Sequence, residues 1–384
     1  MSNKRTLTRR NFVASASLAA ASTVLPVSLQ AAGSGKSAGT CLIPTARGDA
    51  IPSSKLGLTL PTELIIQEST EVNMNWPDVS WGGAPEEERI AWVVEQLKYA
   101  HENFGVDTII DRTIPGIGRN VPRMQKVAKQ VPVNIIVTTG WYTLYELPYY
   151  FHYRENFPEM YGPGDGPSLE DFIVRDIEEG ILDTGVRAAA IKVLSDKYGI
   201  EGTPDVRKVF GISARAHRRT GAPLLTHTVG TDMARLQQDV FLEDGVDLSR
   251  VVLGHLDRAA PDAKLSEFEF LLDRGSFISF DGWGNGEPNM VASNPSSREK
   301  NLDRIVALIN KGYGDHILIS AGLMPFYDAF PQAFRAGGNY HAYSRLAVDI
   351  IPTLKEMGVS DADIKRLTVD NPRRVLESKC LGGY

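Results

Sequence analysis

The chain alternates short apolar runs with longer segments in which apolar residues recur every three or four positions. The short runs are rich in Val, Ile and Leu and predict buried strands. They lie at Leu58–Ile65, Thr108–Asp111, Val133–Thr138, Ala188–Val193, Pro223–His227, Val251–His255, Phe277–Asp281 and His316–Ser320. The periodic segments predict amphipathic helices at Glu86–Phe104, Asn120–Lys129, Leu169–Gly180, Pro204–Arg219, Asp232–Glu243, Leu265–Arg274 and Ser297–Lys311.

This alternation of strand and helix predicts an α/β fold, a (β/α)8 barrel of the TIM type. A doubly wound open sheet is the alternative. It is disfavoured because no glycine-rich dinucleotide turn follows the first strand, and the turn Gly116–Asn120 after the second strand lacks the third glycine.

The N-terminal segment, residues 1–32, predicts a targeting signal rather than part of the fold. Arg9 and Arg10 precede an apolar, alanine-rich stretch from Val13 to Leu29. This pattern resembles a twin-arginine export signal and predicts a periplasmic or extracellular location. A membrane anchor is the weaker interpretation because serines, a threonine and a proline keep the apolar run short. Residues 33–54 are then a linker, 55–376 the barrel and 377–384 a tail.

Charge and cysteine content limit the kinds of molecule that the chain is expected to bind. The formal net charge is −6. The signal carries Lys4, Arg5, Arg9 and Arg10 and no acid, so the remaining chain is more acidic still. This argues against nucleic acid or a stable membrane association and favours a small-molecule ligand. The two cysteines, Cys41 and Cys380, lie near opposite ends, and the sequence leaves open whether they pair.

Three polar residues each close one of the apolar runs: Lys192, His227 and His255. In a (β/α)8 barrel they end strands four, five and six, and their side chains gather at the C-terminal mouth where such barrels carry their active sites. A lysine flanked by Ala190, Ile191 and Val193 is costly to bury as an ammonium, so we expect it to have a partner or a chemical modification.

The sequence resembles the phosphotriesterase family of the amidohydrolase superfamily, which includes the phosphotriesterase-like lactonases. The similarity runs from about Lys55 to Leu376. It rests on Gly57–Leu60, Asp111–Asn120, Thr139–Tyr142, Pro148–Phe151, Ile191–Val193, Thr226–Thr228, Gly254–His255, Gly275–Ile278 and Asn371–Pro372. The resemblance implies the same barrel and a metal-dependent hydrolase of lactones, carboxylic esters or phosphotriesters.

The resemblance also implies a metal centre and shows where this chain departs from it. The family lysine, matched by Lys192, becomes a carbamate that bridges two divalent ions, zinc being the metal expected. The outer ion is also held by two histidines, matched by His227 and His255. The inner ion requires a His-x-His pair and an aspartate, and these positions are occupied by Thr62, Leu64 and Gly322. Glu63 points to the other face of the strand and is no substitute.

These losses predict at most one tightly bound ion per chain and no family-type proton acceptor, because the missing aspartate fills that role in the family. Asp257 and Asp281 are the remaining candidates for a catalytic base. Tyr142 stands where the lactonases place a pocket tyrosine. With it, Trp141, Arg258 and Trp283 are the expected walls of the substrate pocket.

Three hypotheses about function remain after this comparison. The first is family-level activity that is lost or weak, with the barrel serving as an exported small-molecule-binding protein. The second is an esterase or lactonase with a single metal at Lys192, His227 and His255. The third, a conventional binuclear hydrolase, ranks last because no histidine precedes His101. Substrate identity and a homodimeric state are left open by the sequence.

Overall fold

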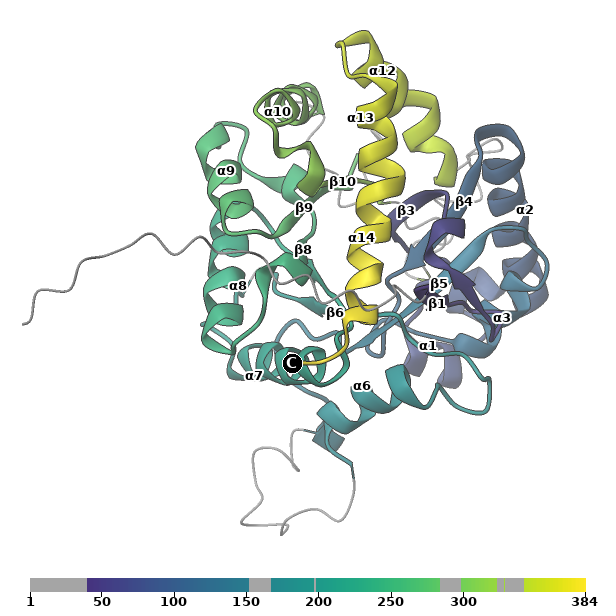
Figure 1. Cartoon of the computed structure of the whole chain (residues 1–384). Coiled ribbons are helices and arrows are strands. Elements are labelled where there is room, and N and C mark those ends of the chain that lie inside the picture. Colours follow the sequence, from purple (N-terminus) through teal and green to yellow (C-terminus); the bar gives the residue numbers. More distant parts are fainter. Residues whose placement is uncertain (1–39, 152–166, 197, 284–297, 323–327, 329–341) are drawn as a thin grey trace, which may run out of the picture. The chain divides into compact units, whose positions relative to one another are not determined.

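Eight parallel strands surround the centre of the structure, each paired with the next along the chain. They are β3 (Leu58–Glu63), β4 (Val106–Asp111), β5 (Asn134–Gly140), β6 (Ala190–Leu194), β7 (Leu224–His227), β8 (Val251–Leu253), β9 (Phe277–Phe280) and β10 (Ile317–Ile319). Helices cover the outside of this ring, so the predicted (β/α)8 barrel is confirmed (Figure 1).

The computed structural model describes residues 40–151, 167–196, 198–283, 298–322, 328 and 342–384. The expected export signal, residues 1–32, lies outside this part of the chain. Residues Thr40–Tyr384 form one unit.

The helices around the barrel begin and end close to the predicted positions. They are α2 (Glu86–Phe104), α3 (Val121–Ala128), α6 (Leu169–Glu178), α7 (Pro204–Thr220), α8 (Thr231–Glu243), α9 (Leu265–Asp273) and α10 (Arg298–Asn310). Local signals set several ends. The Asn120 side chain accepts from the Arg123 amide at the start of α3, and Ser168 with Asp171 forms a capping box on α6. Gly221 ends α7 in the left-handed conformation.

Shorter elements complete the described part of the chain. They are β1 (Leu42–Pro44), β2 (Ala50–Pro52), α1 (Thr70–Asn75), α12 (Ile351–Glu356), α13 (Asp361–Lys365) and α14 (Asn371–Glu377), with 3-10 turns at Ser53–Lys55, Ser80–Gly83, Leu248–Arg250, Leu256–Arg258, Tyr313–His316, Ala342–Ser344 and Ser378–Leu381. Two π-helical turns, Leu346–Ile350 and Arg366–Asp370, run into α12 and α14.

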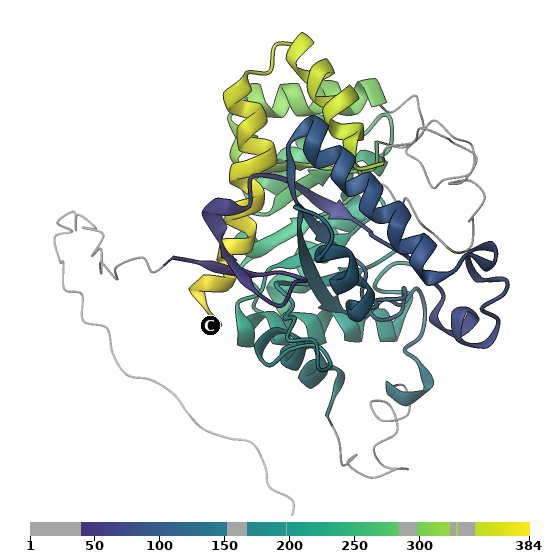
Figure 2. The ribbon, with the colours of Figure 1, turned by 90° about the vertical axis from the view of Figure 1, so that its right-hand side faces the viewer.

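The two ends of the described chain meet at the N-terminal end of the barrel. Strands β1 and β2 form an antiparallel hairpin, which lies beside the C-terminal helix in Figure 2. Cys41 and Cys380 form a disulfide across a sequence separation of 339 residues. The Ser53 hydroxyl donates to Glu377 over 2.6 Å, and Tyr384 Oη lies 2.9 Å from His217 Nε2. Part of the expected linker and the expected tail are therefore packed against the barrel.

Side-chain hydrogen bonds join the first and last strands of the barrel. The Thr62 amide donates to the Ser320 hydroxyl over 3.0 Å. One carboxylate oxygen of Glu63 accepts from the Ser320 hydroxyl at 2.7 Å, the Ala321 amide at 3.0 Å and the Gly322 amide at 3.1 Å. The buried Glu63 thus ties the C-terminal end of β3 to that of β10.

Two apolar clusters fill the fold. The larger lies between the strands and the outer helices and includes Ile191, Val193 and Leu224. The smaller fills the inside of the barrel at its N-terminal end and reaches the hairpin and α14; its members include Ile43, Ile110, Ile136, Ala190, Leu225, Val252, Leu318 and Val375. Because side chains alternate along a strand, Ala190 and Lys192 share the inward face of β6.

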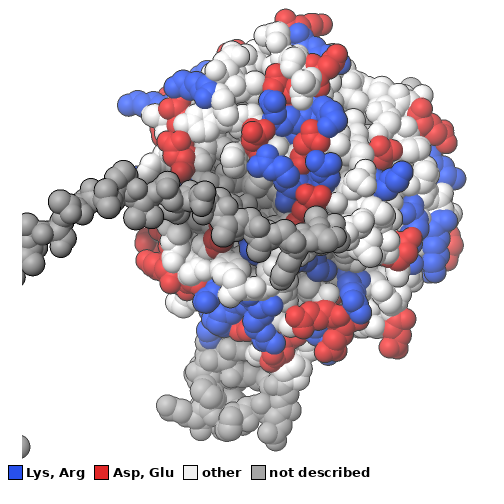
Figure 3. Space-filling view, in the orientation of Figure 1, with Lys and Arg blue, Asp and Glu red and all other residues white. Residues whose placement is uncertain are grey.

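Acidic and basic side chains are interspersed on the face drawn in Figure 3. Over the C-terminal helices, Lys365 pairs with Asp370, and Arg366 pairs with Asp363 and Asp315. No helix within the described residues has both the length and the apolar character needed to cross a membrane.

Candidate functional site

Lys192 lies on the inward face of β6 and is almost fully buried, with 6% of its surface exposed. Its Nζ donates to the backbone carbonyl of Arg112 over 3.1 Å and lies 5.8 Å from the ring centre of Tyr142. Burial, and next the positive charge of Arg112, lower the pKa of Lys192 to about 7. A large share of the amine is therefore neutral at physiological pH, the form that reacts with carbon dioxide to give a carbamate.

The two predicted metal ligands on the neighbouring strands lie side by side. His227 ends β7 and His255 follows β8, and their ring centres are 4.4 Å apart. Burial, and next the neighbouring His255, lower the pKa of His227 to about 3, so this ring is neutral and able to bind a metal. His255 adopts φ +61°, a left-handed conformation that is costly for a residue other than glycine.

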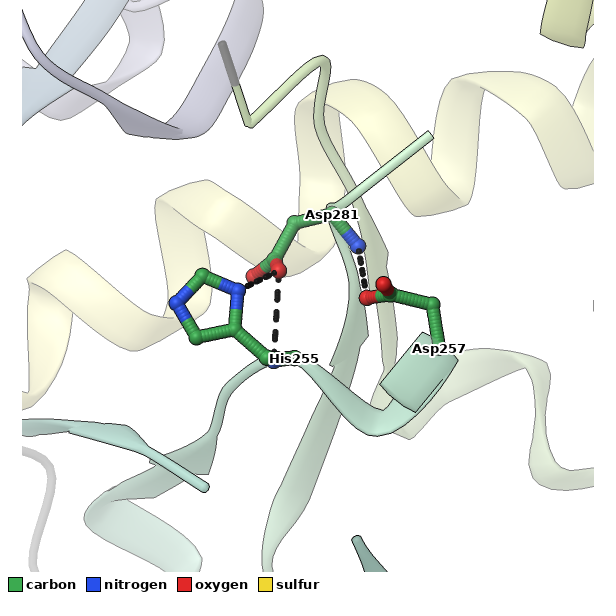
Figure 4. A group of neighbouring side chains, drawn as sticks. All are labelled: His255, Asp257 and Asp281. Carbon is green, nitrogen blue, oxygen red and sulfur yellow. Dashed lines mark hydrogen bonds and ion pairs between the residues drawn. The ribbon is translucent and has the colours of Figure 1, made fainter. Parts of the chain in front are cut away.

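His255, Asp257 and Asp281 form a cluster whose ligand atoms lie within 4.8 Å of one another (Figure 4). Both aspartates are buried and His255 is partly exposed. His255 Nδ1 lies 2.5 Å from Asp281 Oδ1, and the His255 amide donates to the same oxygen over 3.2 Å. A carboxylate on Nδ1 fixes the ring and leaves Nε2 for a metal ion. Asp281 therefore orients His255.

The two candidate bases differ in what their oxygens contact. Asp281 Oδ2 accepts from the Thr62 hydroxyl over 2.8 Å, so both oxygens of Asp281 are engaged. Burial alone would raise the pKa of Asp281, but the His255 ring and the Arg112 guanidinium hold it below its ordinary value. Asp257 Oδ1 accepts from the amides of Asp281 and Gly282. Its Oδ2 has no hydrogen-bond partner among the described residues, and burial followed by the charge of Asp281 raises the pKa of Asp257.

Arg258 contacts His227, one of the three residues expected to bind the outer metal ion. Its Nη1 lies 3.2 Å from His227 Nε2, and Asp196 Oδ2 lies 3.4 Å from the same nitrogen. Arginine only donates, so its contact requires His227 to carry the ring proton on Nδ1; Asp196 favours the opposite tautomer. These two neighbours therefore compete over which nitrogen of His227 is free to bind a metal.

The inner metal position does not fit a metal ion. The hydroxyl of Thr62 is used by Asp281, Leu64 has no donor atom in its side chain, and Gly322 has none either. Gly322 also adopts φ +63°, and a Cβ built on it would lie 1.3 Å from the carbonyl oxygen of Asp281. The outer position fits in part, since Lys192, His227 and His255 supply three suitable donors once the lysine is carboxylated.

Of the four expected pocket walls, the structure places two at the mouth. Tyr142 lies near Lys192, and Arg258 near His227. Trp283 is buried in the larger apolar cluster, and its Nε1 donates to the Phe280 carbonyl over 3.1 Å. Trp141 packs edge-on against Phe151 and lines a cavity of about 320 Å³ between β5 and α6. It also lines, together with Tyr142, a larger cavity of about 1030 Å³.

Arg112, which was not among the predicted site residues, reaches into the barrel just below the mouth. It follows β4 two residues after the inward-facing Ile110, and only 2% of its surface is exposed. Strand alternation from Ile110 was the signal that could have found it, because that parity places residue 112 on the inner face. Asp196, the second partner of His227, was also missed and carries no comparable signal.

Comparisons with known proteins match the whole barrel. The family model of the phosphotriesterase family matches residues 42–376. A phosphotriesterase homology protein of Mycobacterium tuberculosis is 39% identical over 88% of this chain and 98% of its own length. An aryldialkylphosphatase of Saccharolobus solfataricus is 31% identical over 86% and 98%.

A solved structure agrees with these sequence matches. The phosphotriesterase from Mycobacterium tuberculosis superposes with a TM-score of 0.78 at 37% sequence identity, covering 90% of this chain and all of that chain. The barrel, the residues at its mouth and the sequence matches lead to one conclusion: this chain belongs to the phosphotriesterase family.

Proposed function

We propose that this chain is an exported barrel of the phosphotriesterase family that binds a small molecule at its mouth without a binuclear metal centre, so that family-level hydrolysis is lost or weak. The observation that carries this proposal is the backbone conformation of Gly322, whose φ is +63°. At this position the family needs an aspartate, yet any side chain here meets the Asp281 carbonyl. At position 322 this chain therefore differs from the family in backbone conformation as well as in residue type.

The other replaced positions support the same proposal. Thr62 and Glu63 take part in hydrogen bonds that hold β3 to β9 and β10, so they contribute to the fold rather than offering free ligand atoms. Without an inner ion, two-metal polarisation of the substrate is absent. General base catalysis alone is worth about 10²–10⁴ in rate, and the family's acceptor for that proton is missing here.

Export is part of the proposal and rests on two observations. The N-terminal residues resemble a twin-arginine signal, and Cys41 is paired with Cys380. Structural disulfides persist in oxidising compartments, such as the bacterial periplasm, and are rare in the cytosol of mesophiles. Fractionation of cells that express the full chain tests this part, since recovery in the cytoplasm alone would contradict it.

Metal content and hydrolysis test the central proposal together. The protein is incubated with zinc or cobalt and bicarbonate, dialysed, and its metal is counted per chain. We expect at most one ion. The relatives' activities define the assay set: an aryl dialkyl phosphate for the aryldialkylphosphatase, an N-acyl amide for the N-acetyltaurine hydrolase of Dictyostelium discoideum, and additionally an aryl ester and a lactone. Two retained ions with hydrolysis at family rates would refute the proposal.

The second candidate function is hydrolysis by a single metal ion at Lys192, His227 and His255. The observation that favours it is the Asp281–His255 pair, which presents Nε2 of His255 as a ligand next to His227. Three protein ligands leave the fourth zinc position for water. Asp257, whose Oδ2 has no hydrogen-bond partner among the described residues, would be the base. Lys192→Ala should then remove both the ion and the activity. A metal content unchanged in this variant would rule out this ligand set.

A further inference from the structure

Arg112 reaches across the inside of the barrel from the end of β4. Its Nε donates to the Pro61 carbonyl on β3 over 2.9 Å, and its Nη1 lies 3.4 Å from the Thr226 carbonyl on β7. A Cβ built on Gly254, next to His255, would lie 3.2 Å from Nη1. The guanidinium therefore lies against Pro61, Thr226 and Gly254, the residues that directly precede Thr62, His227 and His255.

This guanidinium is a permanent charge. Burial lowers the pKa of Arg112 to about 10, which still leaves it protonated at neutral pH, and Asp281 and Glu63 act in the opposite direction. A buried cation is tolerated when acids compensate it. Here the compensating acids are the two that contact the replaced ligand positions, since Asp281 accepts from Thr62 and Glu63 accepts from the Gly322 amide.

The hydrogen bonds of Arg112 leave part of its charge unpaired. Both contacts above are to backbone carbonyls, and Nη2 has no hydrogen-bond partner within the described part of the chain. The positive charge is thus aimed into the barrel interior rather than neutralised by a single ion pair. The charge of Arg112 also lowers the pKa of Lys192, because it disfavours the protonated form of that amine.

We infer that Arg112 supplies the positive charge that an inner metal ion would bring to this barrel, and that it excludes a divalent ion from that position. This inference rests on the proposed absence of the inner metal. Restoring the inner metal ligands alone should therefore not restore binding of the inner ion. The fixed charge of Arg112 would repel a divalent ion strongly, because little water screens two charges inside the barrel. The inner charge of this chain is also covalent and cannot be removed by a chelator.

The test uses zinc counted per chain after loading with zinc and bicarbonate and desalting. Four proteins are compared: the wild type, Thr62→His/Leu64→His, and the same double variant carrying Arg112→Met or Arg112→Lys. We expect no gain over the wild type with Arg112 or with lysine, and a gain of one ion with methionine. The lysine variant is the matched control because it keeps a positive charge and loses the planar guanidinium.

Each of the four proteins has a result that would overturn either the inference or the proposed function. A gain of one ion by the double variant with Arg112 in place would overturn the inference, as would a folded methionine variant that gains none. Two ions in the wild type would instead overturn the proposed function. Should the methionine variant fail to fold, Arg112→Gln in the same double variant replaces it, because glutamine is neutral and keeps an N–H donor for the backbone carbonyls. A folded glutamine variant that gains no ion would also overturn the inference.

Discussion

The hydroxyl of Thr62 donates to Asp281 Oδ2 over 2.8 Å, while the other oxygen of Asp281 faces His255 Nδ1. Through this single carboxylate Thr62 on β3 is connected to His255 after β8. In the proposed function, this hydrogen-bond network stands where the family would hold its inner metal ion. Substitutions that recreate the family ligands have to disrupt that network before they can bind an ion.

The first prediction concerns Gly322. Gly322→Ala should cost about 3 kcal/mol or more in the free energy of unfolding, because the new Cβ meets a backbone carbonyl that cannot move without displacing β9. Gly312→Ala is the matched control: Gly312 also has positive φ, at +93°, but nothing lies within 4 Å of its Cβ position. That variant should lose about 1–2 kcal/mol from backbone strain alone. Equal losses in urea unfolding would mean that the clash at Gly322 is relieved cheaply.

A second prediction concerns the seam between β3 and β10. Glu63→Gln should destabilise the barrel by about 2 kcal/mol, since one carboxylate oxygen accepts three hydrogen bonds from Ser320, Ala321 and Gly322. Glu71→Gln, on the exposed surface of α1, should change the free energy of unfolding by less than about 0.5 kcal/mol. Urea unfolding measures both. A Glu63 variant as stable as the Glu71 variant would show that the seam is held by other contacts.

The third prediction concerns the disulfide. Cys41→Ser should lower the free energy of unfolding by about 4–5 kcal/mol, because Cys41–Cys380 closes a loop of 339 residues in the unfolded chain. Reducing agent should produce the same loss in the wild type and no further loss in the variant. A wild type that is insensitive to reductant would mean that the hairpin and α14 hold together without the covalent bond.

Much of the barrel was predictable because its signals are local. Runs such as Val251–Leu253 are apolar on both faces, as buried parallel strands require, and α6 begins at a capping box. The hairpin β1–β2 has no such signal. Its two strands are three residues long and both end in proline, and its position depends on a disulfide and a helix from the far end of the chain.

The sequence predicts which side chains face the mouth of the barrel but not which of them contact one another. Position at strand ends identifies Lys192 and His227 as facing the mouth. Which charges meet inside the barrel depends on strand register, and β3 departs from regular register between Leu60 and Glu63. That irregularity determines where the carbonyl of Pro61 and the hydroxyl of Thr62 lie, and therefore what Arg112 and Asp281 contact. Sequence patterns do not encode such a shift.

A fourth prediction follows from the lowered pKa of Lys192. Between its folded value of about 7 and the value near 10.4 of an unfolded lysine, the unfolded chain binds a proton that the folded chain does not. The stability of the wild type should therefore rise with pH across this window, by up to about 1.4 kcal/mol per pH unit from this group. Urea unfolding at pH 7.5, 8.5 and 9.5 in bicarbonate-free buffer measures the slope. Lys192→Met should remove this contribution, and an equal slope in the variant would assign it to other groups.

The last prediction concerns Arg258 and the outer metal position. Arg258→Met should raise the affinity for zinc or cobalt by about tenfold or more, equivalent to about 1.4 kcal/mol. Two effects act together. The guanidinium no longer opposes a divalent ion beside His227, and Asp196 is left as the neighbour of Nε2, which moves the ring proton there and frees Nδ1. Arg258→Lys keeps a positive charge near the ring and should bind the metal little better than the wild type. Cobalt titration followed by visible absorption measures the affinity in each protein. If the methionine and lysine variants bind cobalt equally, charge at position 258 does not control the site, and the limit on metal binding lies deeper, at Lys192 or Arg112.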